Sequence, residues 1–292
     1  MRKSDGLTLL EILIALFVFG IVAAIATSGV TSSLRVQAIN EAASSAQAKL
    51  RRITEVFTQE LRSAVLGGVT NQPYAANSSQ ISFLLLDGGA GYQVIHKSGT
   101  FTTQNFTDLA PTGAIGDVSY LNGREILLVN SSGEAVVMRV TGVATNSSNG
   151  NSYRLTHSAC LNTIAFTPNT LILSVRSLGV SYNAGDSTLY QREGSGSALP
   201  VAFDMDGFLL EYVYQEADGT PHVEAQPILQ GGVPSRTGVI GGAPVTLARV
   251  QMTVSTSEAR GGGNDLVRSY MGQVEMATNP SFQINRVVIC NA

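Results

Sequence analysis

Residues 7–26 read LTLLEILIALFVFGIVAAIA and hold one ionisable side chain, Glu11. The next ionisable side chain in the sequence is Arg35. At about 1.5 Å per residue, a helix of this length covers roughly 30 Å of hydrocarbon. The stretch therefore predicts one membrane-spanning helix. A buried helix of a water-soluble protein is the alternative, but apolar runs of this length are rare in such folds.

The charged residues before and within this span predict its orientation and a need for a cationic partner inside the membrane. Arg2 and Lys3 precede it, so the positive-inside rule places the N-terminus in the cytoplasm and the rest of the chain outside. Glu11 lies inside the apolar block, where a carboxylate costs a few kcal/mol and favours a cationic partner. A secretory signal cleaved near residues 23–26 is the alternative, and it leaves Glu11 unexplained.

The apolar pattern continues beyond the span as an amphipathic one. Apolar residues recur every three or four positions at Ile39, Ala43, Ala46, Leu50, Ile53, Phe57, Leu61 and Ala64. This spacing is typical of a helix with one buried face. We therefore predict a single long helix with a membrane half at residues 7–33 and an amphipathic half at residues 34–66, ending at Gly67-Gly68.

The start of the chain resembles a known family. A basic leader, MRKSDG, followed by Leu7-Thr8-Leu9-Leu10-Glu11 and an apolar helix, is similar to the class III signal of type IV pilins and type II secretion pseudopilins. The resemblance implies that prepilin peptidase removes the leader, residues 1–6, by cutting between Gly6 and Leu7, and that Leu7 is then N-methylated. Most family members have Phe where this chain has Leu7.

The resemblance also implies how such a chain works. The new amine of Leu7 in one subunit would pair with Glu11 of a neighbour, which offsets the desolvation of both groups and sets the register. The implied partners are prepilin peptidase, other major and minor pilins, and the inner-membrane assembly platform, with no cofactor. The implied location is the bacterial inner membrane, followed by the pilus, the periplasm or the cell surface. Many pilins have a helix-breaking proline where this chain has Ser28, so we expect a straighter helix.

The remaining residues, 67–292, predict a β-rich head. Apolar or alternating runs occur at residues 81–86, 125–129, 135–141, 171–175, 208–214, 245–254 and 286–289. Turn residues separate these runs, and Asp218-Gly219 predicts a hairpin between 208–216 and 222–225. In 245–254 the alternation changes phase near Ala248 and Arg249, which indicates a bulge. The fold class expected is α+β, type IV pilin-like, with the helix packed on a large antiparallel head.

A second resemblance lies within the head. Residues 208–227, FLLEYVYQEADGTPHVEAQP, and residues 247–256, LARVQMTVST, are similar to paired segments of the large minor pilins and pseudopilins of the W and J types. Those proteins usually carry Trp after the Asp-Gly turn, whereas this chain has Pro221 and His222 there and no Trp at all.

Composition and motifs weigh against several other functions. Charged residues make up 13% of the chain, the net charge is −3 and the pI is about 5.6, so direct nucleic-acid binding is not expected even though several arginines lie among the strands. Those arginines are Arg139, Arg154, Arg176 and Arg192. The three histidines, His96, His157 and His222, have no metal-ligand spacing, and no catalytic motif is present. Residues 204–207 and 260–265 resemble calcium loops only in part, so turns are expected.

The chain has two cysteines, Cys160 and Cys290, which allow one disulfide. In an oxidising exterior a bridge between them would pin the C-terminal strand, and two unpaired buried thiols are the alternative. Taken together, the sequence predicts a minor pilin in a priming or tip complex, supporting motility, adhesion or DNA uptake. A J-type pseudopilin of type II secretion is the nearest alternative. A membrane-anchored adhesin or an exported enzyme would be of a different class.

Overall fold

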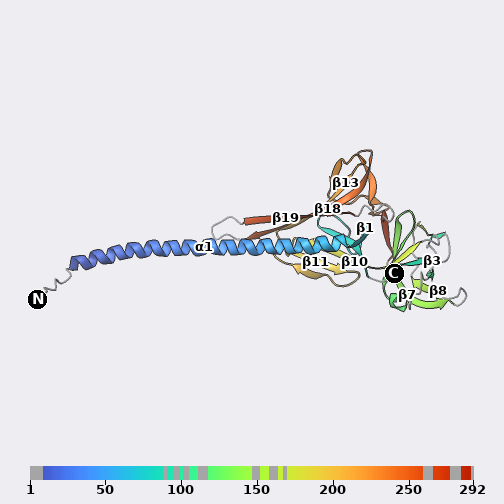
Figure 1. Ribbon diagram of the computed structural model, residues 1–292, viewed down its shortest axis with the longest axis horizontal. Coiled ribbons are helices and arrows are strands. Elements are labelled where there is room, and N and C mark those ends of the chain that lie inside the picture. The colour runs from blue at the N-terminus through green and yellow to red at the C-terminus, as the bar shows by residue number, and fades with distance from the viewer. Residues whose placement is uncertain are drawn as a thin grey trace. The chain divides into compact units, whose positions relative to one another are not determined.

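The protein is described from a computed structural model, shown in Figure 1. The structure describes residues 9–87, 91–94, 99–100, 105–110, 118–146, 152–157, 164–166, 170–258, 266–276 and 284–290. It contains one α-helix, α1 (Leu9–Arg62), followed by a large region of mainly antiparallel strands. The expected α+β class, with a helix packed on a sheet-rich head, is confirmed.

The chain divides into two compact units, which are described separately. One comprises Met1–Lys49 with Glu258–Leu266, and the other comprises Leu50–Ser257 with Val267–Ala292. The helix α1 runs through both as one uninterrupted element of 54 residues. No proline precedes Pro73, so nothing in the sequence removes a backbone donor from this helix. The helix continues through Ser28 as the prediction of a single long helix requires, and the straighter course expected there stays a prediction.

The helix ends earlier than its sequence suggests. Its last turn closes at Ser63, whose N–H donates to the carbonyls of Gln59 and Glu60 at 3.1 Å. Strand β1 (Ala64–Thr70) begins at the next residue and pairs with β2 (Gln80–Leu86). Gly67-Gly68 therefore lies inside a strand, in the stretch between Ala64 and Val69 where the pairing register shifts. The predicted end at this pair is wrong, because sheet pairing overrides the glycine stop signal.

The second unit contains two main sheets. The larger has eleven strands: β1, β2, β3 (Tyr92–Val94), β5 (Phe106–Ala110), β6 (Glu125–Val129), β7 (Glu134–Asn146), β8 (Ser152–His157), β10 (Leu171–Asn183), β11 (Thr188–Glu193), β12 (Leu199–Ala202) and β20 (Arg286–Cys290). The smaller has five: β13 (Gly207–Gln215), β14 (Pro221–Glu224), β17 (Thr237–Ile240), β18 (Ala243–Glu258) and β19 (Leu266–Glu275). Short pairs join β4 (Gly99–Thr100) to β9 (Ala165–Phe166) and β15 (Leu229–Gln230) to β16 (Val233–Pro234), and one 3-10 turn is η1 (Ser119–Leu121).

Part of the larger sheet closes into a ring of six strands. Leu171 and Ile172 of β10 pair with both β3 and β6, so these two strands lie on opposite edges of β10. From β3 the pairing continues through β5, β8 and β7 and returns to β6. Alternate positions point into this ring: Ile126 and Leu128 of β6 join an inner cluster, whereas Leu127 belongs to another. Closure of this kind removes exposed strand edges.

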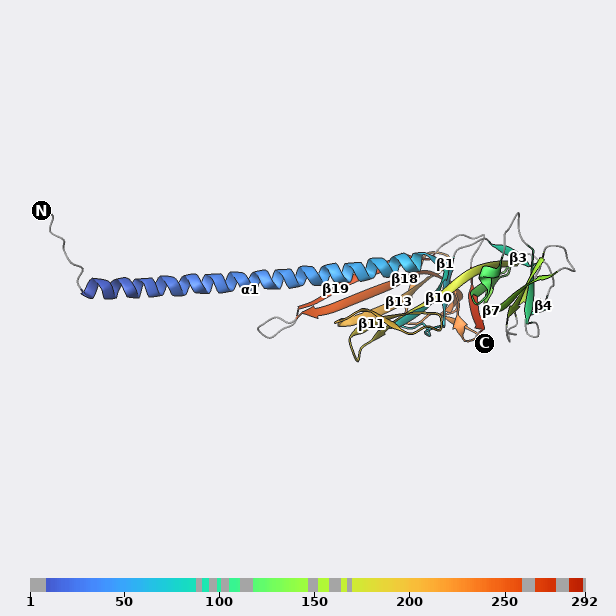
Figure 2. The same cartoon turned by 90° about the horizontal axis from the view of Figure 1, so that it is seen from below.

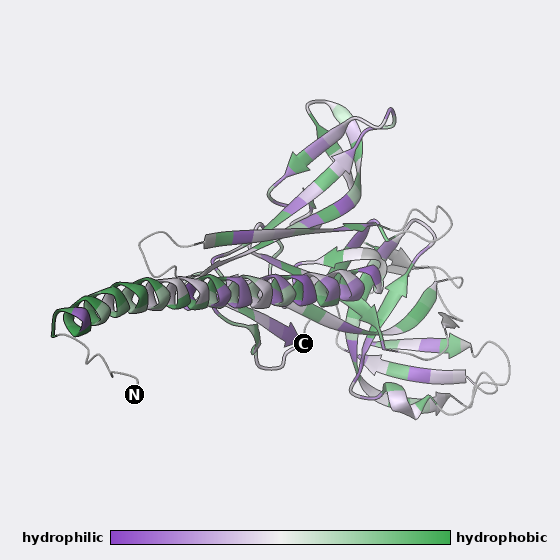
Figure 3. Ribbon diagram, turned by 60° about the vertical axis from the view of Figure 1, so that its left-hand side comes forward, coloured by the Kyte–Doolittle hydropathy of each residue, from purple (hydrophilic) through white to green (hydrophobic). Residues whose placement is uncertain are grey.

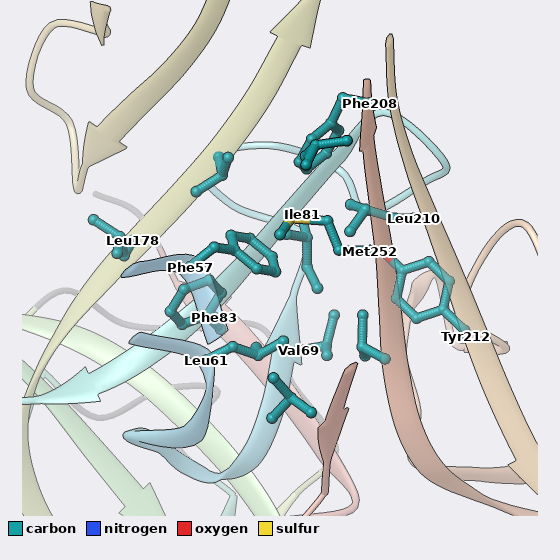
Figure 4. Packing of buried hydrophobic residues seen from close by; sticks show 14 of the residues in the cluster. Phe57, Leu61, Val69, Ile81, Phe83, Leu178, Phe208, Leu210, Tyr212 and Met252 are labelled. Carbon is teal, nitrogen blue, oxygen red and sulfur yellow. The ribbon is translucent and has the colours of Figure 1, made fainter. Parts of the chain in front are cut away.

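The C-terminal part of α1 packs on both sheets (Figures 2 and 4). Leu50, Phe57 and Leu61 are almost fully buried and follow helical spacing. The Phe57 ring meets Phe83 of β2 edge-on at 6.3 Å and Phe208 of β13 at 6.2 Å, measured between ring centroids. One side chain of the helix thus contacts a strand of each sheet.

Two predicted details of the head are confirmed. Strands β13 and β14 form a hairpin around Asp218-Gly219, with Gly219 at a φ of 91°. In the β13–β18 pairing, Val213 lies opposite Arg249 and Tyr214 opposite Leu247, so Ala248 is the extra residue of a bulge. One pairing departs from the expected antiparallel pattern: β20 runs parallel to β7.

Candidate assembly site

The candidate site is the apolar half of α1. Within the described part, the helix starts at Leu9 and places Glu11 in its first turn. Gly6 and Leu7, the residues of the expected cleavage and methylation site, lie outside the described residues. Their processing remains a prediction.

Large apolar side chains of this segment are exposed along its whole length. Leu9 is 79% exposed, Phe17 71% and Ile25 68%. The most apolar window of the helix has no buried side chain, and the helix is long and apolar enough to cross a membrane. Figure 3 shows this change along α1, from hydrophobic near its start to mixed further on. Such a surface needs cover from lipid or from other protein.

The polar atoms of the segment are compatible with an apolar surrounding. The Thr27 hydroxyl donates to the Ala23 carbonyl at 2.7 Å, and the Thr31 hydroxyl donates to the Thr27 carbonyl at 2.9 Å. These bonds within the helix satisfy the hydroxyl donors of Thr27 and Thr31 without water. The space around Gly20 and Gly29 is open, since nothing lies within 4 Å of where a Cβ would be. Small residues of this kind permit close approach of another helix.

The comparison with family models agrees with this site. Residues 1–27 match the family model of the prokaryotic N-terminal methylation motif. The N-terminus of this chain carries this motif, followed by a long apolar helix, which is consistent with a type IV pilin-like protein. Neither the curated proteins nor the solved structures include a match to the chain. The class III signal and the exposed apolar helix together support anchoring by a single span, processing by prepilin peptidase and membrane assembly with other pilins.

The amphipathic half holds the head on the helix. Besides the buried apolar face, the Gln191 amide of β11 contacts the Glu60 carboxylate at 3.4 Å, and burial raises the pKa of Glu60. Strand β19 approaches the same stretch so closely that a Cβ on Gly272 would lie 2.2 Å from Thr54 Cγ2. No sequence pattern predicted this contact, because a lone glycine in a strand has many explanations.

The other residues singled out in the sequence do not gather at one place. His157 of β8 is buried against the Thr107 hydroxyl at 2.8 Å, and His222 of β14 lies 2.7 Å from the Glu216 carboxylate. His96 lies outside the described residues. Among those that are described, no three His, Cys, Asp or Glu side chains form a group that could hold a metal ion. The absence of a cofactor remains an expectation.

The arginines considered for DNA binding have local partners in most cases. Arg154 makes two hydrogen bonds to Asp108, at 2.7 and 2.9 Å, and Arg176 contacts Glu193 at 3.2 Å. Arg192 donates to the Gly196 carbonyl at 2.8 Å, and Arg139 is exposed on β7. Two of the four guanidinium groups are therefore paired with carboxylates, which lowers the charge they present to a phosphate backbone.

The cysteines and the calcium-like stretches are only partly described. Cys290 ends β20 and packs partly buried beside the core of the strand ring. Cys160 lies outside the described residues, as do residues 260–265, so the bridge remains a prediction. Asp204 has a φ of 53°, and the next residue, Met205, is buried in the core, which is consistent with a turn at 204–207.

Proposed function

We propose that this chain is a minor pilin of a type IV pilus. In this proposal, prepilin peptidase cuts between Gly6 and Leu7, Leu7 is methylated, and the N-terminal helix enters a priming or tip complex from the inner membrane. The observation that carries the proposal is the exposed apolar half of α1, which overlaps the methylation motif and is continued by a helix that is packed into a head. The N-terminus is cytoplasmic, and the head lies outside.

The physical reasoning favours an assembly subunit over an inert anchor or an exported enzyme. Moving an apolar helix from lipid into a bundle of helices costs little hydrophobic free energy, so one surface serves before and after assembly. A simple anchor requires neither an acidic residue in the span nor a helix that continues into the head. In a bundle, Glu11 would meet the Leu7 amine of a neighbour, and this pairing would set the axial register.

The size of the head is the reason for proposing a minor subunit. Residues 67–292 attached to one helix would crowd a fibre built from thousands of copies, whereas a tip position has room. Quantitative mass spectrometry of purified fibres should find this chain far below the principal subunit. Finding it as the principal subunit would overturn the minor role.

A J-type pseudopilin of type II secretion remains the second candidate, because the paired segments that resemble W and J types lie side by side as β13 and β18. The two candidate functions predict different phenotypes when the gene is deleted. Deletion of the gene should abolish pili in the first case. In the second it should leave pili intact and retain secreted proteins in the periplasm.

The decisive experiment replaces Glu11 by Val and measures incorporation into fibres. We expect membrane insertion and head folding to be unchanged and incorporation to be lost. Glu41→Ala is the matched control, because Glu41 is an exposed carboxylate of the same helix beyond the span, bonded only to Gln37 in the described structure. Normal incorporation of Glu11→Val would contradict the assembly proposal and favour an inert anchor.

A further inference from the structure

A second feature of the head is a polar pocket of about 330 Å³. It lies at the junction of β6 and β11, which pair with successive parts of the edge of β10 that faces away from β2. Between the two strands, the Gly194 N–H donates to the Ser177 carbonyl at 2.8 Å. The pocket is therefore built on paired strands. Its volume is at the lower end of the range of small-molecule sites, about 300–1,000 Å³.

Strand pairing places the charged side chains of the pocket on one face of the sheet. Residues that pair across adjacent strands point to the same face, as do residues two or four apart along a strand. Arg139 of β7 pairs with Glu125 of β6, which pairs with Val175 of β10. Four residues further along β10, Gly179 pairs with Arg192 of β11. Both guanidinium groups therefore leave the sheet on the same face as the Glu125 carboxylate, and all three residues line the pocket.

The two arginines keep hydrogen-bond donors for a ligand. Arg139 is exposed and makes no hydrogen bond or ion pair within the described structure. Arg192 uses its Nε, which donates to the Gly196 carbonyl at 2.8 Å, and its two Nη atoms have no partner among the described residues. Both groups are therefore able to donate to an anion that enters the pocket.

The carboxylate of the pocket is only half used. Oε2 of Glu125 accepts from the Ser177 N–H at 3.2 Å and from the Ser177 hydroxyl at 3.0 Å, whereas Oε1 has no partner in the described structure. Apart from Glu125 and the two arginines, none of the described residues around the pocket is charged. Two guanidinium groups and one carboxylate give the pocket one net positive charge.

This charge pattern favours a carboxylate ligand. A guanidinium group binds a carboxylate through two parallel N–H bonds. A phosphate dianion would meet more repulsion from Glu125 than a carboxylate monoanion does. The free Oε1 of Glu125 is an acceptor, so the ligand should also bring donors, and hydroxyl groups are suited to this role.

The rest of the wall suits a sugar ring. Gln72 and Ser195 add neutral polar groups, and Pro73 and Ile289 add apolar surface. A sugar ring presents hydroxyl groups at its edge and C–H groups on its faces, so it can meet both kinds of surface. We propose that the pocket binds one acidic sugar, a hexuronate. Its carboxylate pairs with the guanidinium groups of the two arginines, and a hydroxyl group donates to the Glu125 carboxylate.

The test titrates the full chain in detergent micelles with methyl β-glucuronide and follows binding by saturation-transfer difference NMR. Methyl β-glucoside is the matched control ligand, because it has the same ring with a hydroxymethyl group in place of the carboxylate. We expect saturable binding of the glucuronide with a Kd on the order of 1 mM, and binding of the glucoside that is at least about tenfold weaker.

Two variants test the arginines separately. Arg139→Met and Arg192→Met should each weaken binding of the glucuronide by at least about tenfold. Because Arg139 is exposed and has no partner in the described structure, its replacement should leave the Tm unchanged. Arg176→Met is the matched control, since Arg176 is exposed, pairs with Glu193 and does not line the pocket. It should bind the glucuronide as the wild type does.

Three results would overturn the proposal. Equal binding of the glucuronide and the glucoside would show that the carboxylate is not recognised. Unchanged binding of the glucuronide by Arg139→Met and Arg192→Met would place the ligand elsewhere. N-acetylalanine, a carboxylate without a sugar ring, should bind at least about tenfold more weakly than the glucuronide. Equal binding of these two carboxylates would indicate a site for the C-terminus of a peptide instead of an acidic sugar.

Discussion

Gly272 lies where strand β19 comes closest to α1. A Cβ at this position would be 2.2 Å from Thr54 Cγ2 and 3.1 Å from Thr58 Cγ2. We predict that Gly272→Ala lowers the free energy of unfolding by about 1–3 kcal/mol, because the strand or the helix must move to admit the methyl group. Thermal unfolding of the full chain in detergent measures the effect.

A rescue and a control separate this clash from a general effect of alanine in a strand. Thr54→Ser removes the Cγ2 atom and keeps the hydroxyl, so it should restore part of the lost stability in the Gly272→Ala background. Gly142→Ala in β7 is the control, because its methyl group would meet Thr156 at an ordinary 3.6 Å. If Gly272→Ala unfolds at the wild-type temperature, the close approach of β19 to α1 is wrong.

Glu60 gives the head a pH dependence with a definite sign. Burial is the largest effect on this carboxyl and raises its pKa above the ordinary value of 4.5, while Gln191 and Arg176 oppose the rise. The folded state therefore holds the proton more tightly than the unfolded state. Its stabilising contribution is complete below pH 4.5 and is lost as pH rises through the folded pKa.

We therefore predict that Glu60→Gln removes this loss. The Tm difference between Glu60→Gln and the wild type should grow in favour of the variant as pH rises from about 4.5 towards neutrality. Glu41→Gln, an exposed change on the same helix, controls for the removal of one surface charge. Parallel Tm curves for Glu60→Gln and the wild type across this range would contradict the burial effect.

At the scale of elements, Phe57 joins the helix to strands of both sheets. Its truncation to alanine removes two edge-on ring contacts and leaves a cavity among buried residues of β2 and β13. We predict a loss of about 3–5 kcal/mol in the free energy of unfolding. Val56→Ala is the matched control, because Val56 is the preceding residue and is 49% exposed, so its change should be small. Similar losses for both variants would contradict the packing of α1 through Phe57.

The elements also show what the sequence could and could not predict. The apolar runs at 125–129 and 208–214 predicted β6 and β13 well, because strands buried in a core carry continuous or alternating apolar residues. The extension of β10 to Asn183 was missed although Leu178, Val180 and Tyr182 alternate with small residues, because those small residues are glycine and serine, which are also typical of turns. The closed ring depends on pairings between distant strands, and no local pattern encodes them.

For the whole molecule, the sequence predicted the apolar half of α1 better than it predicted the head, while the roles of Gly6, Leu7 and Glu11 stay predictions. Glu11 and the apolar half of α1 form one contiguous stretch, and a membrane span can be predicted from the length and composition of such a stretch alone. The small pocket that residues Arg236 and Arg286 help to line shows the opposite situation. Its walls come from β1, β18, β20 and the segment after β16, so only the folded chain brings Arg236 and Arg286 together.

The disulfide predicted between Cys160 and Cys290 is a property of the whole chain. It would close a loop of about 130 residues and tie the end of β20, which runs parallel to β7, to a distant segment. We expect reduction to lower the free energy of unfolding by about 2–5 kcal/mol. Thermal unfolding with and without reductant measures this effect, and mass spectrometry after alkylation counts the thiols. A Cys160→Ser, Cys290→Ser double variant should show no effect of reductant. Two alkylated thiols in the oxidised wild-type protein would show that the bridge does not form.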